Sequence, residues 1–281
     1  FFFQAEDGIR DRSPSRGLGD VYTRQVIHPI PAFSDNYIWA LLDADQQQAC
    51  VVDPGDANPV IDYLEANGLT LTDIFITHHH PDHTGGLKTL ISEYSPTVYG
   101  PEPSGIQGIS DFLHEGDTAT LFGHRFSIYE VPGHTLDHIA YYCDETDPPL
   151  LFCRDTLFAA GCGRLFEGTP AMMHKSLSKL SALDSNTSIY CTHEYTMANL
   201  KFANAADPDN RELMARIERE QAKRDQSQPT LPSSVQLELD TNPFLRCDQP
   251  ALKESASSRL SQPVEDEIEV FAAIRNWKDN F

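Results

Sequence analysis

The chain has 281 residues, of which 40% are hydrophobic, and a formal charge of -21 at neutral pH. This length and apolar content suffice for a sizeable core in one large or two modest domains. The negative charge argues against a nucleic-acid partner, which needs clustered Lys and Arg, and no apolar run approaches the roughly 18 residues of a membrane span.

Residues 1–25 differ in character from the rest of the chain. They begin with Phe1 instead of methionine and have no signal-peptide layout. The stretch resembles the translated read-through of a sequencing adapter. We therefore expect a non-native, disordered segment that takes no part in the fold.

The elements predicted for the remaining chain change at residue 193. Tyr37–Leu42 and Ala49–Asp53 are strand-like runs around a polar turn, which is the pattern of a hairpin, and Asn58–Asn67 reads as a helix that ends at Gly68. Further strands are expected at 73–77, 97–99, 124–131, 138–143, 150–153 and 188–192, and a helix at 170–183. Beyond residue 193 we expect helices at 195–206, 210–224 and 264–279, no strand, and polar connectors at 227–232 and 239–243.

The cysteines bear on the cellular compartment. Six of them are scattered through the chain without C-x-x-C pairs, mostly inside apolar runs: Cys50, Cys143, Cys153, Cys162, Cys191 and Cys247. This usage predicts buried free thiols in a reducing cytosol, and hence a cytoplasmic protein.

A dense group of metal-ligand residue types follows the predicted strand that ends near Ile76. The segment from Thr77 to Gly86 reads T-H-H-H-P-D-H-T-G-G. In an extended stretch the alternate residues His78, His80 and Asp82 would share one face, with His83 turned away, so one loop could serve two neighbouring metals. A surface histidine cluster or tag-like tract is the alternative, but the interleaved Pro and Asp and the Gly-Gly argue against it.

Three more candidate ligands have the same context, each placed after a short apolar run. His134 follows the run 126–131, Asp155 follows 150–152, and His193 follows 188–191. Alone, each would more often be a satisfied core histidine or a turn aspartate. Together with the first segment they predict a metal site at the ends of several strands, where open α/β sheets place their ligands.

These motifs carry a family resemblance. T-H-x-H-x-D-H, P-G-H-T, F-C-x-D-T-L-F and C-T-H-E-Y-T resemble the metallo-β-lactamase superfamily, and G-C-G-R-L-F-E-G-T at 161–169 resembles its glyoxalase II branch, the hydroxyacylglutathione hydrolases. The likeness runs from about Val26 to Phe281. It implies an α/β (α+β) fold: an αββα sandwich as the catalytic domain at 26–193, then a smaller α-helical substrate-binding domain at 194–281.

The resemblance also implies a centre of two divalent metal ions. One set would be His78, His80 and His134, the other Asp82, His83 and His193, with Asp155 as the bridging ligand. Zinc is the expected metal, although iron and manganese accept the same ligands.

The implied reaction is hydrolysis of S-(2-hydroxyacyl)glutathione, chiefly S-D-lactoylglutathione, to glutathione and D-lactate, the second step of methylglyoxal detoxification. Asp82 would orient the hydroxide that the metals generate at neutral pH. Family members contact glutathione through residues that match Arg164, Tyr195, Arg275 and Lys278. No nucleic-acid or membrane partner is implied, and we expect a monomer.

Three positions depart from the family pattern. Phe166 stands where some members carry tyrosine. Arg154 and Asp137 replace frequent glycines, and we expect Asp137 to orient His134. Glycine suits a positive φ, whereas Arg154 adds bulk and charge beside two cations, so either its guanidinium points into solvent, or metal binding is weakened, or a glycine codon was misread.

Two other functions stay open at this stage. One is a persulfide dioxygenase-like oxidoreductase with a single iron, which shares the fold and a glutathione-derived substrate. The other is an inactive metal- or glutathione-binding module, which Arg154 makes conceivable.

Overall fold

Two six-stranded sheets make the centre of the computed structural model, which describes residues 26–102 and 105–281. The first sheet has the order β1 (Val26–Ala32), β2 (Asn36–Leu42), β3 (Gln48–Val52), β4 (Thr70–Phe75), β5 (Thr97–Pro101) and β6 (Asp111–Leu113). Strands β1 to β3 form an antiparallel meander, and the pairs from β3 to β6 are parallel. The predicted non-native segment 1–25 lies outside the described residues.

The second sheet joins distant parts of the chain. Its order is β14 (Ser233–Ser234), β13 (Ser188–Ile189), β10 (Leu150–Phe152), β9 (Ile139–Cys143), β8 (His124–Glu130) and β7 (Thr118–Leu121). Among the described strands of this sheet, β10 and β13 are the one parallel pair, and the other neighbours are antiparallel. A separate short hairpin, β11 (Leu157–Phe158) with β12 (Gly161–Cys162), follows β10 in the chain.

The two sheets pack face to face because their central strands are apolar on both sides. On β2, Trp39 and Leu41 face the core between the sheets, while Ile38 and Ala40 face the helices on the outside. Across the sheet interface Phe75 stacks on Tyr141 with ring centroids 4.3 Å apart. This packing confirms the two-sheet sandwich.

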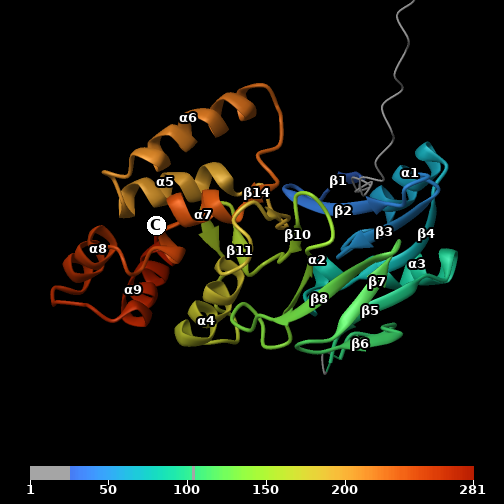
Figure 1. Cartoon of the computed structure of the whole chain (residues 1–281), viewed down its shortest axis with the longest axis horizontal. Helices are drawn as coiled ribbons and strands as arrows, with labels where there is room; N and C mark the ends of the chain where they lie inside the picture. The colour runs from blue at the N-terminus through green and yellow to red at the C-terminus, as the bar shows by residue number, and fades with distance from the viewer. Residues whose placement is uncertain (1–25, 103–104) are drawn as a thin grey trace, which may run out of the picture.

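Helices cover the outer faces of both sheets (Figure 1). The first sheet is covered by α1 (Ala57–Asn67) and α3 (Leu87–Tyr94), and the second by α4 (Pro170–Ser181) together with helices from the C-terminal part. The predicted αββα arrangement is therefore confirmed. Asp56 caps α1 by accepting a hydrogen bond from Asn58 N, and Gly68 ends it in the left-handed conformation, as the sequence predicts.

The C-terminal part is helical, and Figure 1 shows these helices gathered at the end of the sandwich away from β1 and α1. They are α5 (Thr196–Ala206), α6 (Arg211–Asp225), α7 (Val235–Thr241), a 3-10 turn η1 (Pro243–Leu245), α8 (Pro250–Leu260) and α9 (Glu267–Asp279). A second domain from residue 194 stays a prediction, because one continuous core holds side chains from both sides of that boundary, among them Leu151 and Phe271.

Two predictions for this region are wrong. Beyond His193 a strand does occur, since β14 pairs with β13 and extends the second sheet. The expected connector at 239–243 is partly helical, because α7 runs to Thr241. Ser234 starts α7 by accepting a hydrogen bond from Leu237 N.

Candidate metal centre

The predicted ligands all lie on loops that follow buried strands. His78 and its neighbours follow β4, His134 follows β8, Asp155 follows β10, and His193 follows β13. The ends of strands from both sheets therefore meet at one place, and the buried strands anchor these loops. The sequence context of strand followed by ligand is reproduced at all four positions.

The segment that begins at Thr77 turns at His80 and does not stay extended as predicted. The short helix α2 (Pro81–Thr84) begins directly after His80, with Pro81 at its first position. Asp82 thus leaves the face shared by His78 and His80 and joins His83. The turn separates one segment into two ligand groups, so the expectation of Asp82 on the face of His78 and His80 is wrong.

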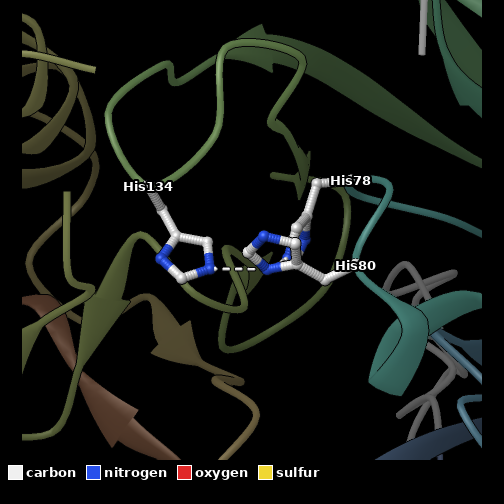
Figure 2. Close-up of side chains that lie close together, drawn as sticks. All are labelled: His78, His80 and His134. Atoms are coloured by element: carbon white, nitrogen blue, oxygen red, sulfur yellow. Dashed lines mark hydrogen bonds between the residues drawn. The ribbon is translucent and has the colours of Figure 1, made fainter. Parts of the chain in front are cut away.

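The first group is made of three histidines, shown in Figure 2. His80 Nδ1 lies 3.2 Å from His78 Nε2 and 3.0 Å from His134 Nε2. Burial, together with the charge of His83, holds the pKa of His78 well below its usual range. Burial also lowers the pKa values of His80 and His134. Neutral imidazoles of this kind are ready metal ligands.

The second group combines Asp82, His83 and His193, whose ligand atoms lie within 4.8 Å of one another. His83 Nε2 is 3.5 Å from Asp82 Oδ2, and His193 Nε2 is 4.0 Å from the same oxygen. Asp155 lies between the groups: its Oδ2 is 3.4 Å from His134 Nε2 and 3.6 Å from His193 Nε2, while its Oδ1 is 3.5 Å from His83 Nε2.

These residues fit a pair of cations on two observations. His83 Nε2 is buried and, within residues 26–102 and 105–281, has no hydrogen-bond partner, although it points at two carboxylates. Burial alone would lower the pKa of His83, but Asp155 and Asp53 raise it well above its usual range. The site thus attracts positive charge, and imidazole with carboxylate is a donor set that suits zinc, iron and manganese.

The carboxylates of the centre are ionised. The nearby imidazole of His83, with Nε2 3.5 Å from Asp82 Oδ2, lowers the pKa of Asp82 to about 2. Burial would raise the pKa of Asp155, but the nearby imidazoles of His83 and His193 hold it well below its usual range.

Further residues orient the predicted ligands, and they are not among the site residues predicted from the sequence. Asp53 Oδ2 lies 2.9 Å from His83 Nδ1, and Asp35 Oδ1 lies 2.8 Å from His193 Nδ1. Such carboxylates fix the ring orientation and raise the basicity of a metal-binding histidine. Asp53 was recognisable from the sequence as a candidate, because it lies at the end of a predicted strand and Asp155 likewise comes shortly after one.

Two expectations about unusual residues are wrong. Arg154 does not point into solvent: it is 1% exposed, and its Nε donates to Asp53 Oδ2 at 2.9 Å. Asp137 does not orient His134, because its Oδ1 lies 3.0 Å from His79 Nδ1. The main-chain carbonyl of Arg164 takes that place, 2.9 Å from His134 Nδ1.

A cavity of about 650 Å³ opens beside the two groups. All four predicted substrate contacts line it: Arg164, Tyr195, Arg275 and Lys278. Two aromatic rings cover the histidines at its floor. Tyr195 stacks on His193 at 4.5 Å between centroids, and Phe166 lies edge-on to His134 at 5.2 Å.

The cationic residues of this cavity differ in how far their side chains are exposed and hydrogen-bonded. The Arg275 side chain is 5% exposed, with Nη1 donating to the Cys162 carbonyl oxygen at 2.9 Å and Nη2 to Asp279 Oδ1 at 2.9 Å. The Arg164 side chain is 66% exposed. Burial and the neighbouring Arg275 charge lower the pKa of Lys278 to about 8. The roles of these residues as substrate contacts stay a prediction.

Two other expectations concern the whole chain. Each of the six cysteines is a buried free thiol, as predicted. In the part of the chain that the structure describes, no helix has the length and apolar character needed to cross a membrane.

Comparison with known protein families finds two matches along the chain. The profile of the metallo-β-lactamase superfamily matches residues 37–193, and the profile described as hydroxyacylglutathione hydrolase C-terminus matches residues 194–281.

Relatives that match over nearly their whole length are also named hydroxyacylglutathione hydrolase. A hydroxyacylglutathione hydrolase of Chromohalobacter salexigens is 51% identical over 253 residues, which are 90% of this chain and 98% of the relative. Another, of Pseudomonas aeruginosa, is 51% identical over 256 residues, covering 91% of this chain and 99% of the relative.

Solved structures share the fold at lower identity. ETHE1 from Myxococcus xanthus aligns with a TM-score of 0.61 at 22% identity, covering 90% of this chain and 99% of its own. The BLEG-1 B3 metallo-β-lactamase aligns with a TM-score of 0.59 at 22% identity, covering 78% of this chain and 99% of its own. At this identity the likeness supports the fold alone.

Proposed function

Since the chain belongs to the hydroxyacylglutathione hydrolases of the metallo-β-lactamase superfamily, we propose that it hydrolyses the thioester of S-(2-hydroxyacyl)glutathione, chiefly S-D-lactoylglutathione. The products are glutathione and a 2-hydroxy acid, D-lactate for the chief substrate. The observation that most supports this proposal is a single cavity, which joins the two groups of His and Asp ligands to a set of cationic residues.

The first cation site of the proposal is His78, His80 and His134, and the second is Asp82, His83 and His193, with Asp155 shared between them. Divalent cations bound there supply activated water at neutral pH and polarisation of the thioester carbonyl. Zinc is the proposed metal, with iron and manganese as the alternatives.

Asp82 orients the attacking water in this proposal. Its side chain is 42% exposed at the floor of the cavity, and it is ionised because its pKa is about 2. Asn36 Nδ2 donates to its Oδ2 at 3.3 Å and so helps to fix the carboxylate. An ionised carboxylate accepts a hydrogen bond from water and holds it in line with the bound thioester.

The protein needs no nucleophilic side chain for this reaction. Cys162 is the thiol that lines the cavity, and burial raises its pKa, so it stays protonated and unreactive. The leaving glutathione thiolate is a weak base, because an ordinary thiol has a pKa of about 8.5, and it therefore requires no strong general acid.

The glutathione part of the substrate carries carboxylates, and local cations can bind them despite the net charge of -21. Arg164 and Lys278 offer charge at the wall of the cavity, Tyr195 offers a hydroxyl, and Arg275 adds a buried positive charge behind them. We further propose a monomer that acts in the cytoplasm.

Thiol release from S-D-lactoylglutathione, measured beside the metal content of the same preparation, tests the proposed function. We expect hydrolysis with two metal ions per chain. Asp155→Asn removes the shared ligand, so it should lower the rate by at least about a hundredfold and deplete metal from the second site first. A chain that holds two metals but leaves this thioester intact would overturn the proposal.

The alternatives predict different results. The curated relatives and the C-terminal family profile support the hydrolase and not the dioxygenase-like oxidoreductase. Oxygen uptake with glutathione persulfide would reverse that conclusion. An inactive binding module would be silent both as the unmodified chain and as Arg154→Gly.

A further inference from the structure

Asp53 connects both groups of proposed cation ligands. It is fully buried directly after β3, and its Oδ2 lies 2.9 Å from His83 Nδ1. The same oxygen accepts a hydrogen bond from Thr77 Oγ1 at 2.7 Å, and Thr77 Oγ1 lies 3.1 Å from His78 Nδ1. Asp53 thus reaches the second group directly and the first group through one hydroxyl.

Arg154 adds a third donor to this one oxygen, with Nε at 2.9 Å. Its side chain is 1% exposed, and its backbone has a φ of 43°, the left-handed region that favours glycine. Nη1 is buried and has no hydrogen-bond partner among the described residues. A guanidinium keeps its charge at any ordinary pH, so this positive charge is permanent.

The consequence for cation binding follows from the sharing of Asp53 Oδ2. A carboxylate behind a ligating histidine makes the imidazole a stronger metal ligand. Arg154 draws on the same oxygen and so weakens the support that His83 receives. It also brings a fixed positive charge close to the second group, where like charges repel.

Arg154 should affect cation binding by the first group, His78, His80 and His134, less strongly. His78 is linked to Asp53 only through Thr77, and His134 is oriented by the carbonyl oxygen of Arg164 instead of by a carboxylate. The influence of Arg154 should therefore fall mainly on His83.

We propose that Arg154 is a positioning residue that weakens cation binding at Asp82, His83 and His193 relative to His78, His80 and His134. The chain would then load its two cations with clearly unequal affinities. This inference rests on the proposed function only in taking the two groups as cation sites.

Zinc titration of the metal-free full chain, in competition with a chromophoric chelator, tests the proposal. The unmodified chain should show two separate dissociation constants. Arg154→Gly, which suits the backbone at this position, should strengthen the weaker site by about ten- to a hundredfold and leave the tighter site unchanged. Arg154→Gln keeps most of the side chain without its charge and should shift the weaker site in the same direction.

Arg125→Gln is the matched control, because it removes the same charge from an exposed arginine that pairs with Glu145 and does not touch Asp53. Both of its dissociation constants should equal those of the unmodified chain. Circular dichroism of each metal-free variant checks folding, and Arg154→Gln carries the test if Arg154→Gly does not fold.

The proposal is overturned by two equal sites in the unmodified chain, or by a weaker site that does not respond to the folded Arg154 variants. It is also overturned if Arg125→Gln produces the same shift. Failure of the proposed function is a separate result, since thioester hydrolysis is measured independently of these constants.

Discussion

At the scale of single residues, we predict that Lys278 links the pH of the medium to substrate binding. Burial, with Arg275 nearby, lowers its pKa to about 8. The ammonium is therefore charged below that pH and becomes a neutral amine as the pH rises through it. A substrate carboxylate bound by this charge loses its partner above about pH 8.

The prediction is a KM for S-D-lactoylglutathione that rises above about pH 8 while kcat changes less. Lys278→Met should raise KM at neutral pH by about ten- to a hundredfold, since a charged hydrogen bond contributes roughly 1.5–3 kcal/mol, and should remove this limb of the profile. Lys278→Arg should keep the charge and move the limb to higher pH. Steady-state kinetics from pH 6 to 10, about two pH units on either side of this pKa, measure both effects.

Lys201 provides the control for Lys278. It is an exposed lysine on α5 whose Nζ lies 5.8 Å from the Phe281 ring centroid. Lys201→Met removes the same charge outside the cavity lining and should leave the KM profile as it was. A profile that is identical in Lys278→Met and in the unmodified chain would contradict the role given to Lys278.

At the scale of elements, the helical part holds the β11–β12 hairpin by its backbone. Glu238 on α7 accepts from Ala160 N at 2.7 Å, Asn242 Nδ2 donates to the Gly161 carbonyl oxygen at 2.9 Å, and Asn199 Nδ2 donates to the Ala159 carbonyl oxygen at 3.0 Å. The hairpin carries Phe158, whose ring packs against His193 and Tyr195. The shape of the cavity therefore depends on α5 and α7.

Glu238→Gln should loosen this hairpin. Arg216 Nη2 donates to Glu238 Oε1 at 2.7 Å in a fully buried pair, and breaking such a pair from one side costs about 3–5 kcal/mol. We expect the free energy of unfolding to fall by that amount and amide exchange at residues 157–162 to accelerate more than elsewhere. Denaturant titration and hydrogen exchange by mass spectrometry measure the two effects.

Asp240→Asn is the matched change on the same helix. Asp240 Oδ1 accepts from Gln236 in an exposed pair, so its loss should cost no more than about 0.5 kcal/mol. Equal effects of the two substitutions would mean that Glu238 contributes only helix-surface charge.

The region around α7 also shows where local sequence patterns fail. Val235, Leu237 and Leu239 alternate with polar residues as in a strand, and yet this segment is a helix because Ser234 caps it and Glu238 finds a buried partner on α6. By contrast, Asn58–Asn67 was predictable because its cap and its closing glycine are local. The predicted ligands lay in recognisable motifs, whereas the partners of Asp53 and Arg154 come from strands far apart in the chain.

At the scale of the whole molecule, the two parts matched by different family profiles share one core. Phe271 and Ile274 of α9 belong to the same buried cluster as Val131 and Leu151 of the second sheet region. Apolar area buried across the boundary couples the stability of the parts, so we expect one cooperative unfolding transition for the chain.

The two tryptophans allow this coupling to be measured, because Trp39 lies in β2 and Trp277 in α9. In a Trp277→Phe background, fluorescence reports only on the sandwich through the buried Trp39. Phe271→Ala should then lower the stability seen at Trp39 by about 3–5 kcal/mol, although the substitution is in the helical part. Ile268→Ala, on the same helix but 39% exposed, should change it by less than about 0.5 kcal/mol. If Phe271→Ala leaves the unfolding transition seen at Trp39 unchanged, the helical part unfolds as an independent domain. The cavity between the two parts would then open before the metal centre is lost.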